Sequence, residues 1–231
     1  MISAFRLLFV LSDEFLRRTA FCWRQYSSSG DEFDLECISA SSGACVQMRL
    51  VQRQSMAVAN EFGTTLGNAR PQGTIMATVR GSATSCLDID GVAFTGGSDI
   101  HLSAQYVGGY SAGDVKTEVT GVLYHEVVHV WQWGLQDYEA HSGIFEGIAD
   151  FVRLKAGLAP GHWVQPGQGD RWDQGYDVTA RFLDYCDSIM PGFVAQLNAK
   201  LKDGYSEDYF VQILGKDVQQ LWQDYKAKYG G

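Results

Sequence analysis

The sequence predicts an α+β fold in which strands come first and a helical half follows. Three observations support this. Residues 100–107 alternate apolar and polar side chains, which is typical of a half-buried strand. Downstream of residue 111, apolar residues recur at helical spacing in several successive segments. Glycine and proline lie between these segments, where helices usually end.

The helical half begins with a segment that starts between Ser111 and Asp114 and ends near Trp133, with Gly134 after it. A second helix is expected over residues 142–156, again followed by a glycine. Prolines and glycines make residues 159–173 a loop. Further helices are expected over residues 176–188, 192–202, 206–214 and 217–229.

The N-terminal part has a different character. Residues 24–85 are rich in Ser, Gly, Gln and Ala and show few periodic segments, and residues 27–30 and 39–43 are typical of loops. We therefore expect residues 1–84 to be a loop-rich segment poorly matched to the rest, and residues 85–231 to form the principal domain. A misassembled gene or an alternative first exon would account for such a change.

Composition excludes several classes of partner. The chain has 231 residues, a formal net charge of -9 and 45% hydrophobic residues, which is ordinary for a globular protein. An acidic chain repels phosphate backbones and anionic lipid surfaces, so we expect neither nucleic acid nor membrane as a partner. The five cysteines include no Cys-x-x-Cys pair, so a cysteine zinc site is not expected.

A short apolar stretch near the N-terminus, residues 7–11, loosely resembles a secretory signal. Arg6 precedes it, and no small-x-small cleavage site follows before Asp13. The resemblance is weak, so these residues equally fit an ordinary N-terminal segment.

The strongest motif is the stretch His125-Glu126-Val127-Val128-His129. Histidines four residues apart project from one helix face, so both imidazoles can bind a single zinc ion at about 2.0–2.1 Å. Glu126 lies at the edge of that face, where it can take a proton from a metal-bound water. The surrounding residues are mostly apolar, which predicts a buried helix in which these polar side chains need partners.

A catalytic zinc ion takes three protein ligands and keeps one position open. A third histidine six residues after His129 is excluded because that position is Leu135. Two candidates remain, His141 in the expected connecting loop and Glu146 in the second helix. We prefer Glu146 because Asp150 shares its helix face and could accept a hydrogen bond from a ligand histidine. Gly147 next to Glu146 would let another backbone approach closely.

Other residues are weaker candidates. Tyr176 could donate a hydrogen bond to the oxyanion of a tetrahedral intermediate, and His162 could serve similarly. The tryptophans are more typical of core packing, although Trp163 and Trp172 lie in the predicted loop and are the better candidates for lining a cleft. The strand over residues 100–107 is expected to form the rim of the cleft and to pair with an extended substrate.

Four stretches closely resemble the plant basic secretory protein family: residues 121–133, 146–157, 162–167 and 170–186. The resemblance runs from about residue 88 to residue 230. It implies a secreted, extracellular zinc metallopeptidase with a zincin-like fold, related to the thermolysin-like group and associated with plant defence. That fold combines a mixed N-terminal sheet, an active-site helix carrying the HExxH motif and a helical C-terminal half.

The resemblance also implies site residues and a substrate. In that group the third ligand is a glutamate in a Glu-x-x-x-Asp pattern, which corresponds here to Glu146. The aspartate of the pattern corresponds to Asp150, which would hydrogen-bond to a ligand without binding the metal itself. One Zn²⁺ ion and a peptide or protein substrate are implied. Two features depart from the family: the net charge of -9 does not fit the word "basic", and the first 80 or so residues do not resemble the family's usual N-terminal part.

The alternative to an enzyme is a catalytically silent defence or cell-wall binding protein that keeps zinc only as a structural element. Glu126 discriminates between the two, because a purely structural zinc site has no use for a carboxylate at that position.

Overall fold

The structure is a computed structural model that describes part of the chain. The described backbone comprises residues 7–8, 24–25, 32–40, 45–53, 75–80, 91–97, 99–103, 106 and 115–230. The described side chains are those of residues 91–97, 100–103, 106 and 117–230. The chain divides into two compact units. Among the described residues, unit 1 holds the strands and the first helix up to Val130, and unit 2 begins at Trp131.

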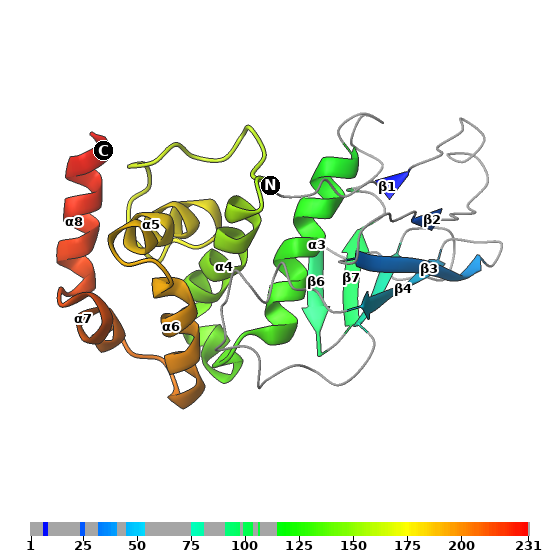
Figure 1. Ribbon diagram of the computed structural model, residues 1–231, viewed down its shortest axis with the longest axis horizontal. Helices are drawn as coiled ribbons and strands as arrows, with labels where there is room; N and C mark the ends of the chain where they lie inside the picture. The colour runs from blue at the N-terminus through cyan, green and yellow to red at the C-terminus, as the bar shows by residue number, and fades with distance from the viewer. Residues whose placement is uncertain are drawn as a thin grey trace. The chain divides into compact units, whose positions relative to one another are not determined.

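Unit 1 is built on a mixed five-stranded sheet with the order β3-β4-β5-β7-β6 (Figure 1). Only β5 and β7 pair in parallel, and the other neighbours are antiparallel. A separate antiparallel pair joins β1 (Leu7–Leu8) to β2 (Arg24–Gln25). The strands of the larger sheet are β3 (Glu32–Ala40), β4 (Cys45–Arg53), β5 (Ile75–Arg80), β6 (Ala93–Gly96) and β7 (Asp99–Ser103).

Strand β7 confirms a strand over residues 100–103, and the predicted alternation holds from Ile100 to Leu102, although Ser103 is buried as well. Ile100 and Leu102 are buried, whereas His101 points to the other face and stacks on Phe94 of β6 at 4.5 Å between ring centroids. However, β7 has β5 on one side and β6 on the other. Its backbone groups are already paired, so the prediction that residues 100–107 form the substrate-binding rim is wrong for residues 100–103. Residues 104, 105 and 107 lie outside the described residues. Among the described strands, β6 is the one at that edge of the sheet.

The sequence predicted loops where three strands of the larger sheet lie. Strands β3, β4 and β5 fall within residues 1–84, and β5 occupies the middle of the sheet. The sequence signal was present but was missed, because apolar and polar residues do alternate in β3 (EFDLECISA) and in β4 (CVQMRLVQR), whereas the prediction weighed the Ser- and Gly-rich residues around them. A domain boundary near residue 84 remains a prediction. The expected loop at residues 27–30 lies outside the described residues. The loop expected at residues 39–43 is wrong at Ser39 and Ala40, which belong to β3, and residues 41–43 lie outside the described residues.

Helix α3 (Val115–Trp131) completes the described part of unit 1. Its predicted apolar face is confirmed at Val119, Val122, Leu123 and Val127, which are all buried. The expected helix start at residues 111–114 lies outside the described residues. Gly134 adopts a φ of 80°, the left-handed conformation that glycine tolerates best, three residues after the helix ends.

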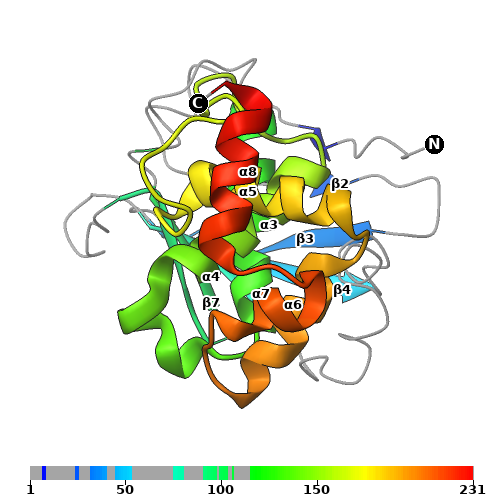
Figure 2. The same cartoon turned by 90° about the vertical axis from the view of Figure 1, so that its left-hand side faces the viewer.

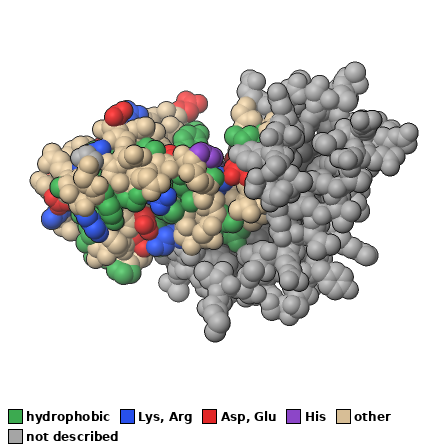
Figure 3. Space-filling model, turned by 90° about the horizontal axis from the view of Figure 1, so that it is seen from above, with side chains coloured by type: hydrophobic (Ala, Val, Ile, Leu, Met, Phe, Trp, Pro, Cys, Tyr) green, Lys and Arg blue, Asp and Glu red, His purple; other side chains and the backbone are tan. Residues whose placement is uncertain are grey.

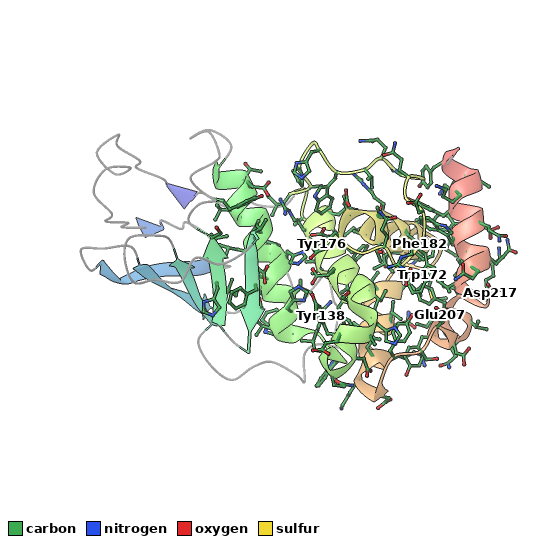
Figure 4. All side chains as sticks on the ribbon, turned by 180° about the vertical axis from the view of Figure 1, so that it is seen from behind. Tyr138, Trp172, Tyr176, Phe182, Glu207 and Asp217 are labelled. Atoms are coloured by element: carbon green, nitrogen blue, oxygen red, sulfur yellow. The ribbon has the colours of Figure 1, made fainter. Side chains whose placement is uncertain are left out.

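Unit 2 is helical, as the sequence predicted. After the short 3-10 helix η2 (Leu135–Asp137) come α4 (Tyr138–Lys155), α5 (Tyr176–Ile189), α6 (Phe193–Lys200), η3 (Leu201–Asp203), α7 (Asp208–Leu214) and α8 (Val218–Tyr229). Helix α8 lies against α5 (Figure 2). Asp217 caps α8, because its carboxylate accepts a hydrogen bond from the Gln220 backbone N–H at 2.9 Å (Figure 4). Residues 159–173 contain no helix, as expected.

Aromatic side chains fill the core of unit 2. Phe182 of α5 is fully buried and contacts Phe210, Trp222 and Tyr225 at ring-centroid separations of 5.4–6.1 Å. Trp172 packs edge-on against Phe210 in the same cluster (Figure 4). Trp172 is therefore a core residue and does not line a cleft, contrary to the expectation.

Trp163 is also buried, at 7% exposure. The Arg153 guanidinium lies over its indole ring, 5.3 Å from the centroid. Arg153 in turn donates from Nε to the Leu158 carbonyl at 3.1 Å. Trp163 thus packs the loop after α4 against that helix, and a cleft-lining role for it is not supported.

Among the described residues, the helices are all too short or too polar to cross a membrane.

Candidate metal centre

The two motif histidines lie one turn apart on α3, and their ring nitrogens converge. The Nε2 atoms of His125 and His129 are 3.1 Å apart, with the ring planes at 80°. Two nitrogens bound to one tetrahedral zinc ion at about 2.0–2.1 Å would lie about 3.3–3.4 Å apart. The pair therefore has close to the spacing needed to chelate one ion. His125 is buried and His129 half-buried.

Glu126 is buried and held by the neighbouring strand. The Thr95 hydroxyl of β6 donates to Glu126 Oε2 at 2.6 Å. The oxygen of that hydroxyl, Thr95 Oγ1, also lies 3.0 Å from the backbone carbonyl oxygen of Glu126. One hydroxyl hydrogen serves one acceptor at a time, and the shorter contact is to the carboxylate. This bond fixes the Glu126 side chain through Oε2 and leaves Oε1 as the oxygen suited to exchange a proton.

Helix α4 carries the two candidate carboxylates. Glu146 and Asp150 are 6% and 3% exposed, one helical turn apart. The apolar residues around these two carboxylates account for that burial, since Ile144, Phe145, Ile148, Phe151 and Val152 are all buried. Buried carboxylates need hydrogen-bond donors or cations as partners. The hydroxyl of Tyr138, eight residues earlier on α4, donates to Glu146 Oε1 (Figure 4).

His141, the other candidate for the third ligand, lies at a break in α4. Its φ of -136° and ψ of 32° are not helical, so the regular helix begins at Ser142, as predicted. The imidazole stacks on Tyr205 with ring centroids 3.6 Å apart and an interplanar angle of 16°. Burial, and secondarily the carboxylates of Glu207 and Asp173, raise the pKa of Tyr205, so its ring remains a neutral phenol. His141 thus occupies a packing position.

Glycines let α4 approach the start of α5 closely. A Cβ at Gly143 would overlap the carbonyl oxygen of Asp173, and a Cβ at Gly147 would overlap the side chain of Thr179. The close backbone approach predicted for Gly147 is therefore made at Gly143, whereas Gly147 meets mainly a side chain. Thr179 accepts a hydrogen bond from the Gly175 N–H and donates to the Trp172 carbonyl, both at 2.8 Å.

Tyr176, the predicted oxyanion donor, lies at the first residue of α5 (Figure 4). It is 56% exposed and has a φ of 45°, the left-handed region that a non-glycine residue rarely adopts. Such backbone strain often occurs at functional positions. His162 is exposed in the loop between α4 and α5.

Two residues of the candidate site were missed by sequence reasoning. Thr95 contacts Glu126 from a strand 31 residues earlier, and no local pattern marks such a pairing. Tyr138 was missed because an eight-residue spacing does not bring side chains together on a regular helix. The ligand types expected from the sequence are present: the His-His-Glu group of His125, His129 and Glu146 could bind a metal ion.

Comparison with known sequences places the chain in the peptidase class. The chain belongs to the family described as "Peptidase of plants and bacteria", whose profile matches residues 26–225. The match begins well before residue 88, where the resemblance was expected to begin. Membership of a peptidase family implies a peptide or protein substrate.

A curated relative is the "Basic secretory protease" of Boswellia serrata. It is 49% identical over 59 residues, which cover 26% of this chain and 67% of the relative. The predicted resemblance to the basic secretory protein family is thereby confirmed. No solved structure matches the chain.

Proposed function

We propose that this chain is a zinc-dependent peptide-bond hydrolase whose His125, His129 and Glu146 together hold one Zn²⁺ ion. The observation that carries the proposal is the 3.1 Å separation of the two histidine Nε2 atoms, close to that of a chelating pair. The donor set of two imidazoles and one carboxylate is that of catalytic zinc sites, which keep a fourth position open. When bound, zinc would lower the pKa of a water molecule and polarise the scissile carbonyl.

Glu126 is the proposed general base. Its carboxylate would accept a proton from the attacking water and pass it to the leaving amine. The Thr95 hydroxyl supports this role, because a bond to Oε2 orients the carboxylate while Oε1 handles the proton. Asp150 would accept a hydrogen bond from a ligand histidine and so hold its tautomer.

Two features support a way of holding the substrate. Strand β6 is at the edge of the five-stranded sheet and carries Thr95, so an extended peptide that pairs with β6 would pass beside Glu126. Tyr176 would donate to the oxyanion of the tetrahedral intermediate. Its exposure and strained backbone fit a side chain that meets the substrate.

The setting of the enzyme is part of the proposal. We infer a zincin-like fold, an extracellular location and a role in plant defence, as the predicted family resemblance implies. The relative's name contains the word "secretory", which supports the location. Acidic and basic side chains are interspersed on the described face in Figure 3, and the net charge is -9, which fits a partner other than nucleic acid.

The alternative function is a binding protein that keeps the metal only for stability. Against it stands the burial of Glu126 beside the histidines. A structural zinc site gains nothing from a buried carboxylate that is not a ligand, and burying the Glu126 carboxylate costs free energy of folding.

The test is incubation of the purified protein with a mixed peptide library, with and without a chelator, followed by mass spectrometry. We expect cleavage that the chelator abolishes and added zinc restores. Cleavage unaffected by the chelator would refute the metal mechanism. A protein that contains about one zinc ion per chain but cleaves no peptide would favour the binding protein.

A further inference from the structure

We propose that Tyr138 is a positioning residue that holds the Glu146 carboxylate in the orientation needed to bind the metal. The proposal deepens the proposed function and rests on Glu146 being a ligand. Its basis is the hydrogen bond from the Tyr138 hydroxyl to Glu146 Oε1, made within unit 2. The break in α4 at His141 makes that bond possible.

A regular helix could not make this contact. Residues eight apart on an α-helix are separated by about 12 Å along the axis. Helical side chains also lean toward the N-terminus, so Tyr138 would point away from Glu146. The non-helical backbone at His141 redirects the first turn of α4, and the phenol then reaches back to the carboxylate two turns further on. The ring also lies 6.1 Å from that of Phe145.

The redirected turn is held by residues far along the chain. The Tyr205 ring stacks on His141, and the Tyr205 backbone N–H donates to Asp137 Oδ2 at 2.9 Å. Asp137 directly precedes Tyr138, so the residues on both sides of the turn are fixed by Tyr205. The broken conformation is thus stabilised by two contacts of Tyr205, one through its ring and one through its backbone N–H, in the segment after η3 (Leu201–Asp203).

The bond has a specific consequence for metal binding. With Oε1 accepting from Tyr138, Oε2 is the oxygen that Glu146 would offer to a metal ion. The donor also restricts the rotamers of Glu146 before the metal arrives, which lowers the entropic cost of binding. Removing a hydrogen bond to a metal ligand usually lowers the metal affinity by about 10–100-fold.

The test is the zinc affinity of Tyr138→Phe, measured by competition with a chelator of known affinity. We expect a loss of about 10–100-fold relative to wild type. Tyr225→Phe is the matched control: it removes a buried phenol oxygen from the aromatic cluster of α8, and its affinity should stay within about twofold of wild type, since it touches no ligand. A loss below about tenfold in Tyr138→Phe, or an equal loss in both variants, would overturn the proposal.

A double-mutant cycle separates positioning from general damage. In the Glu146→Gln background, Tyr138→Phe should cost less than about threefold in residual zinc affinity, because the carboxylate it orients is gone. A loss of the same size in both backgrounds would show a purely structural role and overturn the proposal. Failure of the proposed metal site is distinguishable, since the wild type itself would then bind no zinc. Failure of the proposed hydrolysis alone would leave the wild type without peptide cleavage and these zinc affinities unchanged.

Discussion

The two helices that carry the candidate ligands differ in how their side chains are held. On α3, His125 and His129 lie four apart on an unbroken helix, and that spacing places both rings on one helix face, with their Nε2 atoms 3.1 Å apart. On α4, the helix breaks at His141, and Glu146 is held by Tyr138, whose turn is fixed in turn by Tyr205. Local spacing explains the histidine pair, whereas distant contacts position the carboxylate.

The difference has a physical cause. Two imidazoles four residues apart on one helix face are brought near each other by the backbone, because the helix fixes their Cβ atoms about 5–6 Å apart. A single buried carboxylate has several rotamers and must be held by donors from elsewhere. We therefore expect metal binding through Glu146 of α4 to be sensitive to substitutions at residues that do not contact the metal.

The largest effect should come from the third ligand. Glu146→Gln removes the charged donor and should cost far more zinc affinity than the about 10–100-fold typical of residues behind a ligand. His141→Ala should cost much less, because the imidazole stacks on Tyr205 and has a packing role. Chelator competition measures both. An empty site in His141→Ala with an intact site in Glu146→Gln would reverse the assignment.

The next effect concerns the packing of α4 on the start of α5. Gly143→Ala places a Cβ against the carbonyl oxygen of Asp173, so backbone must move, and the variant should lose about 3 kcal/mol of unfolding free energy. Gly161→Ala is the matched control: nothing lies near its Cβ position, and its stability should change by less than about 0.5 kcal/mol. Urea denaturation followed by circular dichroism measures both. Equal stabilities would contradict the close packing.

The sequence predicted those parts of the fold that depend on local chemistry. The regular start of α4 at Ser142, the helix expected over residues 217–229 and the apolar face of α3 follow from spacing and residue type. Strands β3 to β5 and the internal position of β7 did not follow, because strand pairing joins residues distant in sequence.

The candidate site divides in the same way. The histidines, Glu126 and the burial of Glu146 could be predicted from the HExxH motif and the apolar residues around it. The hydroxyls of Thr95 and Tyr138 could not, since one arrives from another strand and the other depends on a break in a helix.

A smaller effect is expected at Asp150, one turn beyond Glu146. Asp150→Asn keeps the shape but removes the negative charge, and we expect a loss of about 10–100-fold in zinc affinity or in turnover. Asp184→Asn on the neighbouring helix α5 removes a half-buried carboxylate that pairs with Lys155, and should leave both quantities unchanged. An Asp150→Asn variant indistinguishable from wild type would remove Asp150 from the site.

The smallest effect should come from a surface contact remote from both helices. The Lys216 ammonium, 2.8 Å from Asp224, lowers the pKa of that carboxyl below its ordinary value of 3.8 by a hydrogen bond. A lowered carboxyl pKa stabilises the fold above pH 3.8, and this contribution is lost as the pH falls through the lower folded-state pKa. Lys216→Met should lower the unfolding temperature by less than about 2 °C at pH 7, and by less still at pH 2. A larger shift at pH 2 than at pH 7 would contradict this sign.

The most direct test of the central claim is the turnover of Glu126→Gln in the peptide-cleavage assay, with zinc content measured on the same sample. Glutamine keeps the size of the side chain and can still accept the Thr95 hydroxyl bond, but it cannot act as a base. We predict about one zinc ion per chain, an unchanged fold, and a turnover lower by at least about 10²–10⁴-fold than that of wild type. A Glu126→Gln variant that cleaves peptides as fast as wild type would contradict the proposed mechanism.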